Sequence, residues 1–271
     1  KTRLVGLGSA IGGSRVDSSI VATPTATKGI AGDVEAPQRH DSSHKHVAGE
    51  AVFVDDIPTP RGTLAVFVAM SEKAHAKIVD MDLALVRAAP GVACVVAAAD
   101  IPGKNDVSPA MGDDPLFAEG LVEYAGQSLF AVAAETIEMA RNAAALASIT
   151  YEELPAIISI DEAINQASLL EEPYVMARGD AQAAIDGAVH SLSGRVYIGG
   201  QEHFYLEGQA ALAVPGEDGD VTVHSSTQHP SEIQHTIAKV LDLANNAVTV
   251  EVRRMGRAFG GKESNGNLPA A

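Results

Sequence analysis

The chain has 271 residues, enough for two domains of ordinary size, and 46% of them are apolar. Its formal net charge is −16, from 19 basic and 35 acidic residues, and such an acidic surface repels nucleic-acid phosphates and anionic lipid headgroups. We therefore expect neither nucleic acid nor a membrane as a partner.

The first half of the chain predicts a short lead-in and then an α+β domain. Residues 1–37 are rich in Gly, Ser, Thr and Ala without a sustained period, which indicates a lead-in or linker. We bound the domain at residues 38–160. A helix is expected at 136–148, because Thr136 can cap it and alanines fill its body. Apolar or alternating runs bounded by turn residues predict strands at 63–70, 78–83, 92–97, 128–133 and 149–151.

Two kinds of potential metal ligand occur in this half, and both receive a structural interpretation. Cys94 is the only cysteine, so the chain can form neither an internal disulfide nor a thiolate iron–sulfur cluster. It lies in an apolar run and is predicted to be a buried thiol, and this cysteine usage fits the cytoplasm. His40, His44 and His46 are interpreted as part of a solvated loop, because Pro37 and the polar residues around them disfavour an aligning helix.

The second half, residues 161–271, also mixes strands and helices. Strands are predicted at 190–198, 204–214, 221–225 and 248–252, and a short helix at 181–185. A longer helix is predicted at 230–243, where Pro230 suits the first turn. Its apolar residues fall on one face at helical spacing: Ile233, Ile237, Val240 and Leu241.

Two glycine-containing segments in this half are candidate binding loops. Gly256–Glu263 follows a predicted strand, and its glycines allow backbone N–H groups to approach a ligand closely. Its spacing matches the front of a phosphate-binding loop, but Glu263 stands where Mg²⁺ chemistry needs a hydroxyl, which disfavours a nucleotide. In Gly199-Gly200-Gln201, the Gln201 amide could hydrogen-bond an oxo or carbonyl group. The alternatives are a structural turn for the first segment and a bulge with a surface amide for the second.

From about residue 38 to the end, the chain contains sequence blocks in the order that one protein family shows. The most specific are Gly199–Glu207 (GGQEHFYLE), Ser226-Thr227-Gln228 and Arg253–Glu263 (RRMGRAFGGKE). Weaker blocks precede them: HDSSHKHVAGEA at 40–51, SEKAHA at 71–76, ADIPG at 99–103, YAGQ at 124–127 and YEELP at 151–155. In these blocks the chain resembles the molybdopterin-binding subunit of the xanthine dehydrogenase and aldehyde oxidase family.

The resemblance implies a specific fold, reaction and set of partners. It implies an α/β hammerhead domain at 38–160, followed by the start of a molybdopterin-binding domain at 161–271. It also implies oxidative hydroxylation of hypoxanthine and xanthine to urate at a molybdopterin–molybdenum cofactor. The electrons would pass to 2Fe-2S clusters, FAD and NAD through an iron–sulfur/FAD subunit or domain, in a cytoplasmic heterotetramer or larger assembly.

The resemblance also implies roles for single residues. Gln201 resembles the glutamine whose amide contacts the apical oxo group of molybdenum, and Phe259 matches the loop aromatic beside the metal. Gly260 and Gly261 would belong to the cofactor-facing backbone. Glu263 matches the glutamate that hydrogen-bonds the purine. Arg257 departs from the family pattern, because small residues usually stand before the phenylalanine.

Several expectations stay open at this point. The family's base glutamate, a substrate-clamping arginine and the second half of the cofactor cradle are expected beyond residue 271. No catalytic residue is therefore assigned in this chain, which we expect to be inactive alone. An aldehyde or aromatic-heterocycle oxidoreductase of the same family is an alternative. So is a non-catalytic fragment that only assembles with partner subunits.

Overall fold

The computed structural model describes residues 37, 39–256 and 258–263, and the chain divides into two compact units at residues 1–51 and 52–271. The described part of the first unit contains helix α1 (Ser43–Ala48), which ends at Gly49 in the left-handed conformation (φ 72°). The predicted loop is therefore wrong at these residues, because Gly49 supplies a helix C-terminal cap that was not recognised. The rings of His40 and His46 lie 5.8 Å apart. Among the described residues, however, no group of three His, Cys, Asp or Glu side chains could hold a metal.

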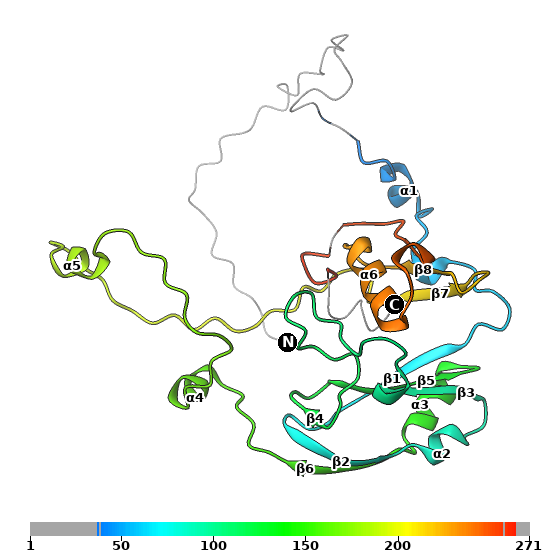
Figure 1. The fold of residues 1–271 in the computed structure, drawn as a ribbon. Helices are drawn as coiled ribbons and strands as arrows, with labels where there is room; N and C mark the ends of the chain where they lie inside the picture. Colours follow the sequence, from blue (N-terminus) through cyan, green and yellow to red (C-terminus); the bar gives the residue numbers. More distant parts are fainter. Residues whose placement is uncertain (1–36, 38, 257, 264–271) are drawn as a thin grey trace, which may run out of the picture. The chain divides into compact units, whose positions relative to one another are not determined.

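The larger unit begins with two three-stranded antiparallel sheets (Figure 1). The first has the order β1-β5-β3 and consists of β1 (Ala65–Met70), β5 (Ser128–Ala134) and β3 (Val92–Ala97). The second has the order β4-β2-β6 and consists of β4 (Leu121–Val122), β2 (Ala76–Asp82) and β6 (Ser148–Glu153). The other regular elements are 3₁₀ turns at Val54–Asp56 and Ala98–Asp100 and helices α2 (Ala84–Arg87) and α3 (Ile137–Ala144). The predicted α+β class is confirmed.

One apolar core holds these elements together. Helix α3 begins as predicted, because Thr136 Oγ1 accepts a hydrogen bond from the Met139 amide at 3.2 Å. It ends at Ala144, earlier than predicted, because Ser148 already pairs with Asp82 as the first residue of β6. The fully buried side chains of this core include Val86, Val122, Leu129, Phe130 and Val132.

Cys94 is exposed, so its predicted burial is wrong. The residue lies on β3, which is an edge strand of its sheet. Side chains alternate between the two faces of a strand, and Val95 and Ala97 occupy the core face. Cys94 therefore points away from the core, although its sequence neighbours are apolar.

A third sheet carries the chain to its C-terminal region. It consists of β7 (Ala211–Pro215), β8 (Val221–Ser225) and β9 (Val248–Glu251), with β7 antiparallel and β9 parallel to β8. Helix α6 (Pro230–Leu241) is the crossover between the two parallel strands, and a 3₁₀ turn at Asn245–Ala247 precedes β9. Ile233 and Val240 of α6 pack with Val107 in a second, smaller apolar cluster. Leu241 was predicted on this face but is 40% exposed, because the helix ends there and Asp242 turns left-handed.

Residues 154–210, between the second and third sheets, contain no strand. They contain helices α4 (Ile160–Asn165) and α5 (Ala181–Asp186), of which α4 was not predicted although Ser159 caps it. The strand predicted at 190–198 is not formed, and the one predicted at 204–214 begins only at Ala211. No described strand pairs with residues 190–198, so their backbone groups lack the ladder that a strand requires. Nor does any helix in the described part of the chain have the length and apolarity to cross a membrane.

Candidate functional site

The topology of the third sheet brings three segments to one end of it. Ala211, the first residue of β7, pairs with Ser225, the last residue of β8, and the neighbouring His224 pairs with Glu251 at the end of β9. The segment before β7 (the 199–210 loop), the turn after β8 and the segment after β9 therefore meet at the same end of the sheet. The described residues of this last segment, 253–256 and 258–263, are called the 253–263 loop. Both candidate binding loops are among these segments.

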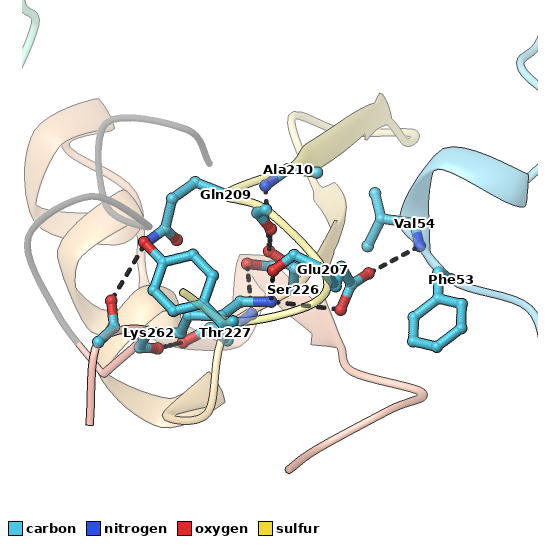
Figure 2. A network of polar contacts seen from close by, with 12 residues as sticks. Phe53, Val54, Glu207, Gln209, Ala210, Ser226, Thr227 and Lys262 are labelled. Carbon is cyan, nitrogen blue, oxygen red and sulfur yellow. Dashed lines mark hydrogen bonds and ion pairs between the residues drawn. The ribbon is translucent and has the colours of Figure 1, made fainter. Parts of the chain in front are cut away.

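Hydrogen bonds fix the 253–263 loop at two consecutive carbonyl groups (Figure 2). Gln209 Nε2 donates to the Gly261 oxygen at 3.1 Å and to the Tyr205 hydroxyl at 2.7 Å. The Lys262 oxygen accepts from Thr227 Oγ1 at 3.0 Å and from the Gln228 amide at 2.9 Å. The loop is thus bound both to the 199–210 loop and to the turn after β8.

The side chain of Lys262 is buried between these segments, with 4% of it exposed. Its Nζ donates to the Glu207 carbonyl oxygen at 2.8 Å and pairs with Glu207 Oε2 at 3.3 Å. The Tyr205 ring lies 5.6 Å from the same ammonium group. The other carboxylate oxygen of Glu207 accepts a hydrogen bond from the Val54 amide at 3.1 Å. The positive charge is thus compensated inside the protein, as a buried charge requires.

Ser226 fixes the base of the 199–210 loop (Figure 2). Its hydroxyl donates to the Gly208 oxygen at 2.9 Å and accepts from the Ala210 amide at 3.0 Å. Its own amide donates to the Ala210 oxygen at 3.0 Å. The conformation of this loop next to β7 is therefore set by the residue that follows β8.

The residues predicted to bind cofactor or substrate lie on these two loops, and most of them face solvent. Gln201 and Glu263 are exposed, and neither makes a hydrogen bond or ion pair with any other described residue. Phe259 is 71% exposed and adopts the left-handed conformation (φ 54°). Gly261 is in contact with the other loop, but within the described residues no hydrogen bond, ion pair or ring contact joins Gln201, Phe259 and Glu263 to each other. Arg257, the departure from the family pattern, lies outside them.

The two adjacent glycines of the 253–263 loop have different reasons to be glycine. A Cβ on Gly261 would lie 2.7 Å from Tyr205 Cε1, so packing between the loops excludes a side chain there. A Cβ on Gly260 would meet no atom within 4 Å, and its φ of 90° disfavours other residues. The backbone at Gly260 therefore faces open space that a ligand could approach.

Two side-chain oxygens of the residues that anchor this loop have no hydrogen-bond partner among the described residues. The Oε1 atoms of Gln209 and Gln228 are buried, and no described residue hydrogen-bonds them. Buried polar atoms are normally paired, so these two oxygens can accept hydrogen bonds from a bound group or from water. Open glycine backbone together with unpaired amide oxygens fits a cofactor rich in hydrogen-bonding groups.

The anchoring residues were not predicted from the sequence. Lys262 lies in the possible phosphate-binding loop, but the sequence predicts no anchoring role for it or for Glu207. The Ser226-Thr227-Gln228 block resembles the family, but nothing in its spacing predicts that it binds the Lys262 carbonyl. The sequence signal that could have found the pair is one lysine directly before the candidate substrate residue, in a strongly acidic chain.

Comparison with protein families matches two consecutive parts of the chain. Residues 48–155 match the aldehyde oxidase and xanthine dehydrogenase a/b hammerhead domain, and residues 165–271 match the molybdopterin cofactor-binding domain. The first match spans the two antiparallel sheets. The second contains the third sheet and all three segments at the candidate site.

Relatives of known identity cover most of this chain. It is 41% identical over 236 residues to xanthine dehydrogenase/oxidase of Gallus gallus, which is 87% of this chain and 17% of that protein. It is 39% identical over 231 residues to xanthine dehydrogenase of Dictyostelium discoideum (85% of this chain, 17% of that protein). It is 41% identical over 226 residues to aldehyde oxidase 2 of Cavia porcellus (83% and 17%). The chain thus spans under a fifth of the length of these relatives.

Solved structures share the fold at lower sequence identity. Quinoline 2-oxidoreductase from Pseudomonas putida 86 matches with a TM-score of 0.69 and 24% identity, over 82% of this chain and 30% of that chain. Aldehyde oxidoreductase from Desulfovibrio gigas matches with a TM-score of 0.68 and 24% identity, over 78% and 26%. These matches establish the fold, and the two family matches identify it as a hammerhead domain followed by a molybdopterin cofactor-binding domain.

Proposed function

Because this chain belongs to the xanthine dehydrogenase and aldehyde oxidase family, we propose that it forms part of a molybdenum hydroxylase that oxidises hypoxanthine and xanthine to urate. The observation that carries this proposal is the meeting of the 199–210 and 253–263 loops at one end of the third sheet. Their bases are anchored inside the protein, and Gln201, Phe259 and Glu263 remain exposed. This is the arrangement expected of a rigid scaffold that presents residues to a ligand.

We propose that the chain consists of a lead-in and two domains. Residues 38–160 are the proposed hammerhead domain, residues 161–271 the first part of the molybdopterin-binding domain, and residues 1–37 a lead-in. The family matches at 48–155 and 165–271 support boundaries near these positions. We further propose that a partner subunit or domain holds the 2Fe-2S clusters and FAD, in a cytoplasmic assembly that is a heterotetramer or larger and passes electrons to NAD.

The residues of this chain have separate roles in the proposed site. Gln201, Phe259, Gly260 and Gly261 would hold the molybdopterin cofactor: the first by its amide, the others by loop backbone. When bound, the cofactor supplies the metal chemistry by which an electron-poor ring is hydroxylated. The Glu263 carboxylate would orient the purine, because it accepts hydrogen bonds when ionised and can donate one when protonated. We propose that a glutamate outside these 271 residues is the general base.

Replacing Glu263 in the complete molybdenum-containing enzyme tests the proposal. Removing one charge-assisted hydrogen bond from the transition state costs about 1.5–3 kcal/mol. We therefore expect Glu263→Ala to lower kcat/KM for xanthine by about 10- to 150-fold, with unchanged molybdenum content. Glu263→Gln keeps the size of the side chain and should lose less.

A suitable control is Glu217→Ala, at an exposed glutamate in the β7–β8 turn at the other end of the sheet. It should leave kcat/KM for xanthine unchanged. If Glu263→Ala behaves like this control, Glu263 does not bind the substrate and the purine assignment is wrong.

A second candidate function is oxidation of aldehydes or other aromatic heterocycles. It is favoured by the 41% identity to aldehyde oxidase 2 of Cavia porcellus, which equals the identity to the xanthine dehydrogenase/oxidase of Gallus gallus. A panel of xanthine, hypoxanthine and an aromatic aldehyde separates the two functions. Purine oxidation predicts that wild-type kcat/KM is higher for the purines and that Glu263→Ala removes this preference.

A further inference from the structure

Lys262 stands directly before the proposed substrate residue, Glu263, but its side chain is buried. Its side chain is 4% exposed, whereas Glu263 is exposed. A buried lysine is costly unless its charge is paired and its N–H groups are hydrogen-bonded. Here both conditions are met by one residue, Glu207, through its carbonyl oxygen at 2.8 Å and its carboxylate at 3.3 Å.

Glu207 connects Lys262 to a third, distant segment. Its side chain is 15% exposed, and its two carboxylate oxygens have different partners. Oε2 pairs with Lys262, which is 55 positions away, and Oε1 accepts from the Val54 amide, which is 153 positions away. One carboxylate therefore ties the 199–210 loop to both the 253–263 loop and the turn at Val54–Asp56.

The Lys262 backbone is fixed as firmly as its side chain. Its oxygen accepts from Thr227 Oγ1 and from the Gln228 amide, and the preceding oxygen, of Gly261, accepts from Gln209. Within the loop, the Gly261 amide donates to the Ala258 oxygen at 2.8 Å. These contacts hold the loop immediately before Glu263, so the position of the Glu263 backbone depends on them.

We propose that Lys262 and Glu207 form a positioning pair that fixes the 253–263 loop against the 199–210 loop and thereby places Glu263 for binding the purine. The pair does not touch the substrate. It supplies a directional restraint that an apolar contact of the same size lacks, because the ammonium group must satisfy a carbonyl and a carboxylate at once. This inference rests on the proposed function for the role of Glu263, but the restraint on the loop does not.

The test uses the complete molybdenum-containing enzyme and two variants. Lys262→Met removes the charge at nearly constant length but leaves the Glu207 carboxylate buried without its partner, which can impair folding. The double variant Lys262→Met with Glu207→Gln removes both charges and keeps an acceptor for the Val54 amide. Replacing both partners of a buried pair is generally tolerated, so the double variant keeps the test informative.

The first measurement is hydrogen exchange, which does not depend on turnover. In the double variant we expect the Gly261 and Gln228 amides to exchange about tenfold faster or more, since their acceptors lie in the released loop. Amides within β7 and β8 should keep their protection. The matched control is Lys239→Met, which breaks a partly buried pair with Asp106 (3.0 Å) away from these loops and should change neither amide.

The second measurement is a double-mutant cycle on kcat/KM for xanthine. The charge-free pair should lower kcat/KM by about tenfold when Glu263 is present and by less than about twofold in Glu263→Ala, because the pair acts through Glu263. A general structural defect would lower both equally. Equal losses in the two backgrounds, or unchanged exchange at Gly261 and Gln228, would overturn the positioning role.

The two proposals fail in different ways. If Glu263→Ala leaves xanthine turnover intact while the double variant still exchanges faster at Gly261, the proposed function is wrong and only the loop restraint stands. If exchange stays at the wild-type level while Glu263→Ala lowers turnover, the proposed function stands and the positioning pair is rejected.

Discussion

Different interactions stabilise the hammerhead region and the region around the third sheet. Among the described residues, the apolar core of the hammerhead region contains 13 buried side chains, whereas the cluster under α6 contains only Val107, Ile233 and Val240. The loops of the candidate site are fixed instead by a buried ion pair and by side chains that bind backbone carbonyls. Apolar burial stabilises a fold without fixing direction, whereas hydrogen bonds fix the orientation of the groups they join.

The same contrast appears in the stretch before the site. Residues 189–198 expose nearly all of their apolar side chains, including Leu192, Val196 and Ile198. They have no strand partner among the described residues, so their strand-like sequence pattern alone does not make them a strand. The difference between the regions teaches that apolar burial stabilises the hammerhead region, while the site depends on a few specific polar contacts.

The largest expected effect is in the hammerhead core. Phe130 is 1% exposed, and Phe130→Ala should lower the free energy of unfolding by about 3–5 kcal/mol, since it removes buried apolar contacts and leaves a cavity. Urea denaturation followed by circular dichroism measures this. The control is Phe259→Ala, the same change at an exposed phenylalanine of the site, which should shift stability by less than about 0.5 kcal/mol. Similar losses in both variants would contradict the contrast between the regions.

A smaller effect concerns the link between the two regions. Asp106 accepts from Lys239 of α6 at 3.0 Å. Burial raises the pKa of the Asp106 carboxyl, but hydrogen bonds from Ser108 and the Lys239 ammonium outweigh burial, so the pKa is lowered overall. A carboxyl whose pKa is lower in the folded state stabilises the fold above its unfolded pKa of about 3.9 and loses this contribution as the pH falls through its folded pKa.

Comparing wild type with Asp106→Asn as a function of pH tests this link. At pH 7 the wild type should be more stable by about 1 kcal/mol, and the difference should shrink as the pH falls below about 4. Asp161→Asn is the control, because its ion pair with Arg195 is exposed and should contribute almost nothing. A stability difference that is constant down to the acid transition would show that the Asp106 charge does not join the regions.

The smallest effect is expected at the surface of the hammerhead region. Because Cys94 points away from the core, the folded chain should react with a thiol reagent as fast as the urea-unfolded chain does. Cys94→Ser should change the free energy of unfolding by less than about 0.5 kcal/mol. A thiol that reacts only after unfolding would place Cys94 in the core and enlarge the apolar cluster accordingly.

Elements with strong local signals were predictable from the sequence. The predicted bounds of β3 (Val92–Ala97) and β8 (Val221–Ser225) agree with the structure, and Thr136 and Pro230 mark the starts of their helices. These signals depend on turn residues, caps and apolar periodicity within one segment. The family and the presence of two domains also followed from ordered sequence blocks, which the family matches confirm.

What only the tertiary structure decided depends on partners far away in the chain. Residues 190–198 have a strand-like pattern but no strand, because a strand needs a neighbour to pair with, and Cys94 is exposed because of the face that β3 turns towards the core. The pairing of Lys262 with Glu207 and of Glu207 with the Val54 amide spans 55 and 153 positions. No local period or spacing encodes such contacts. They exist because the strand order β7-β8-β9 brings both loops to the same end of one sheet.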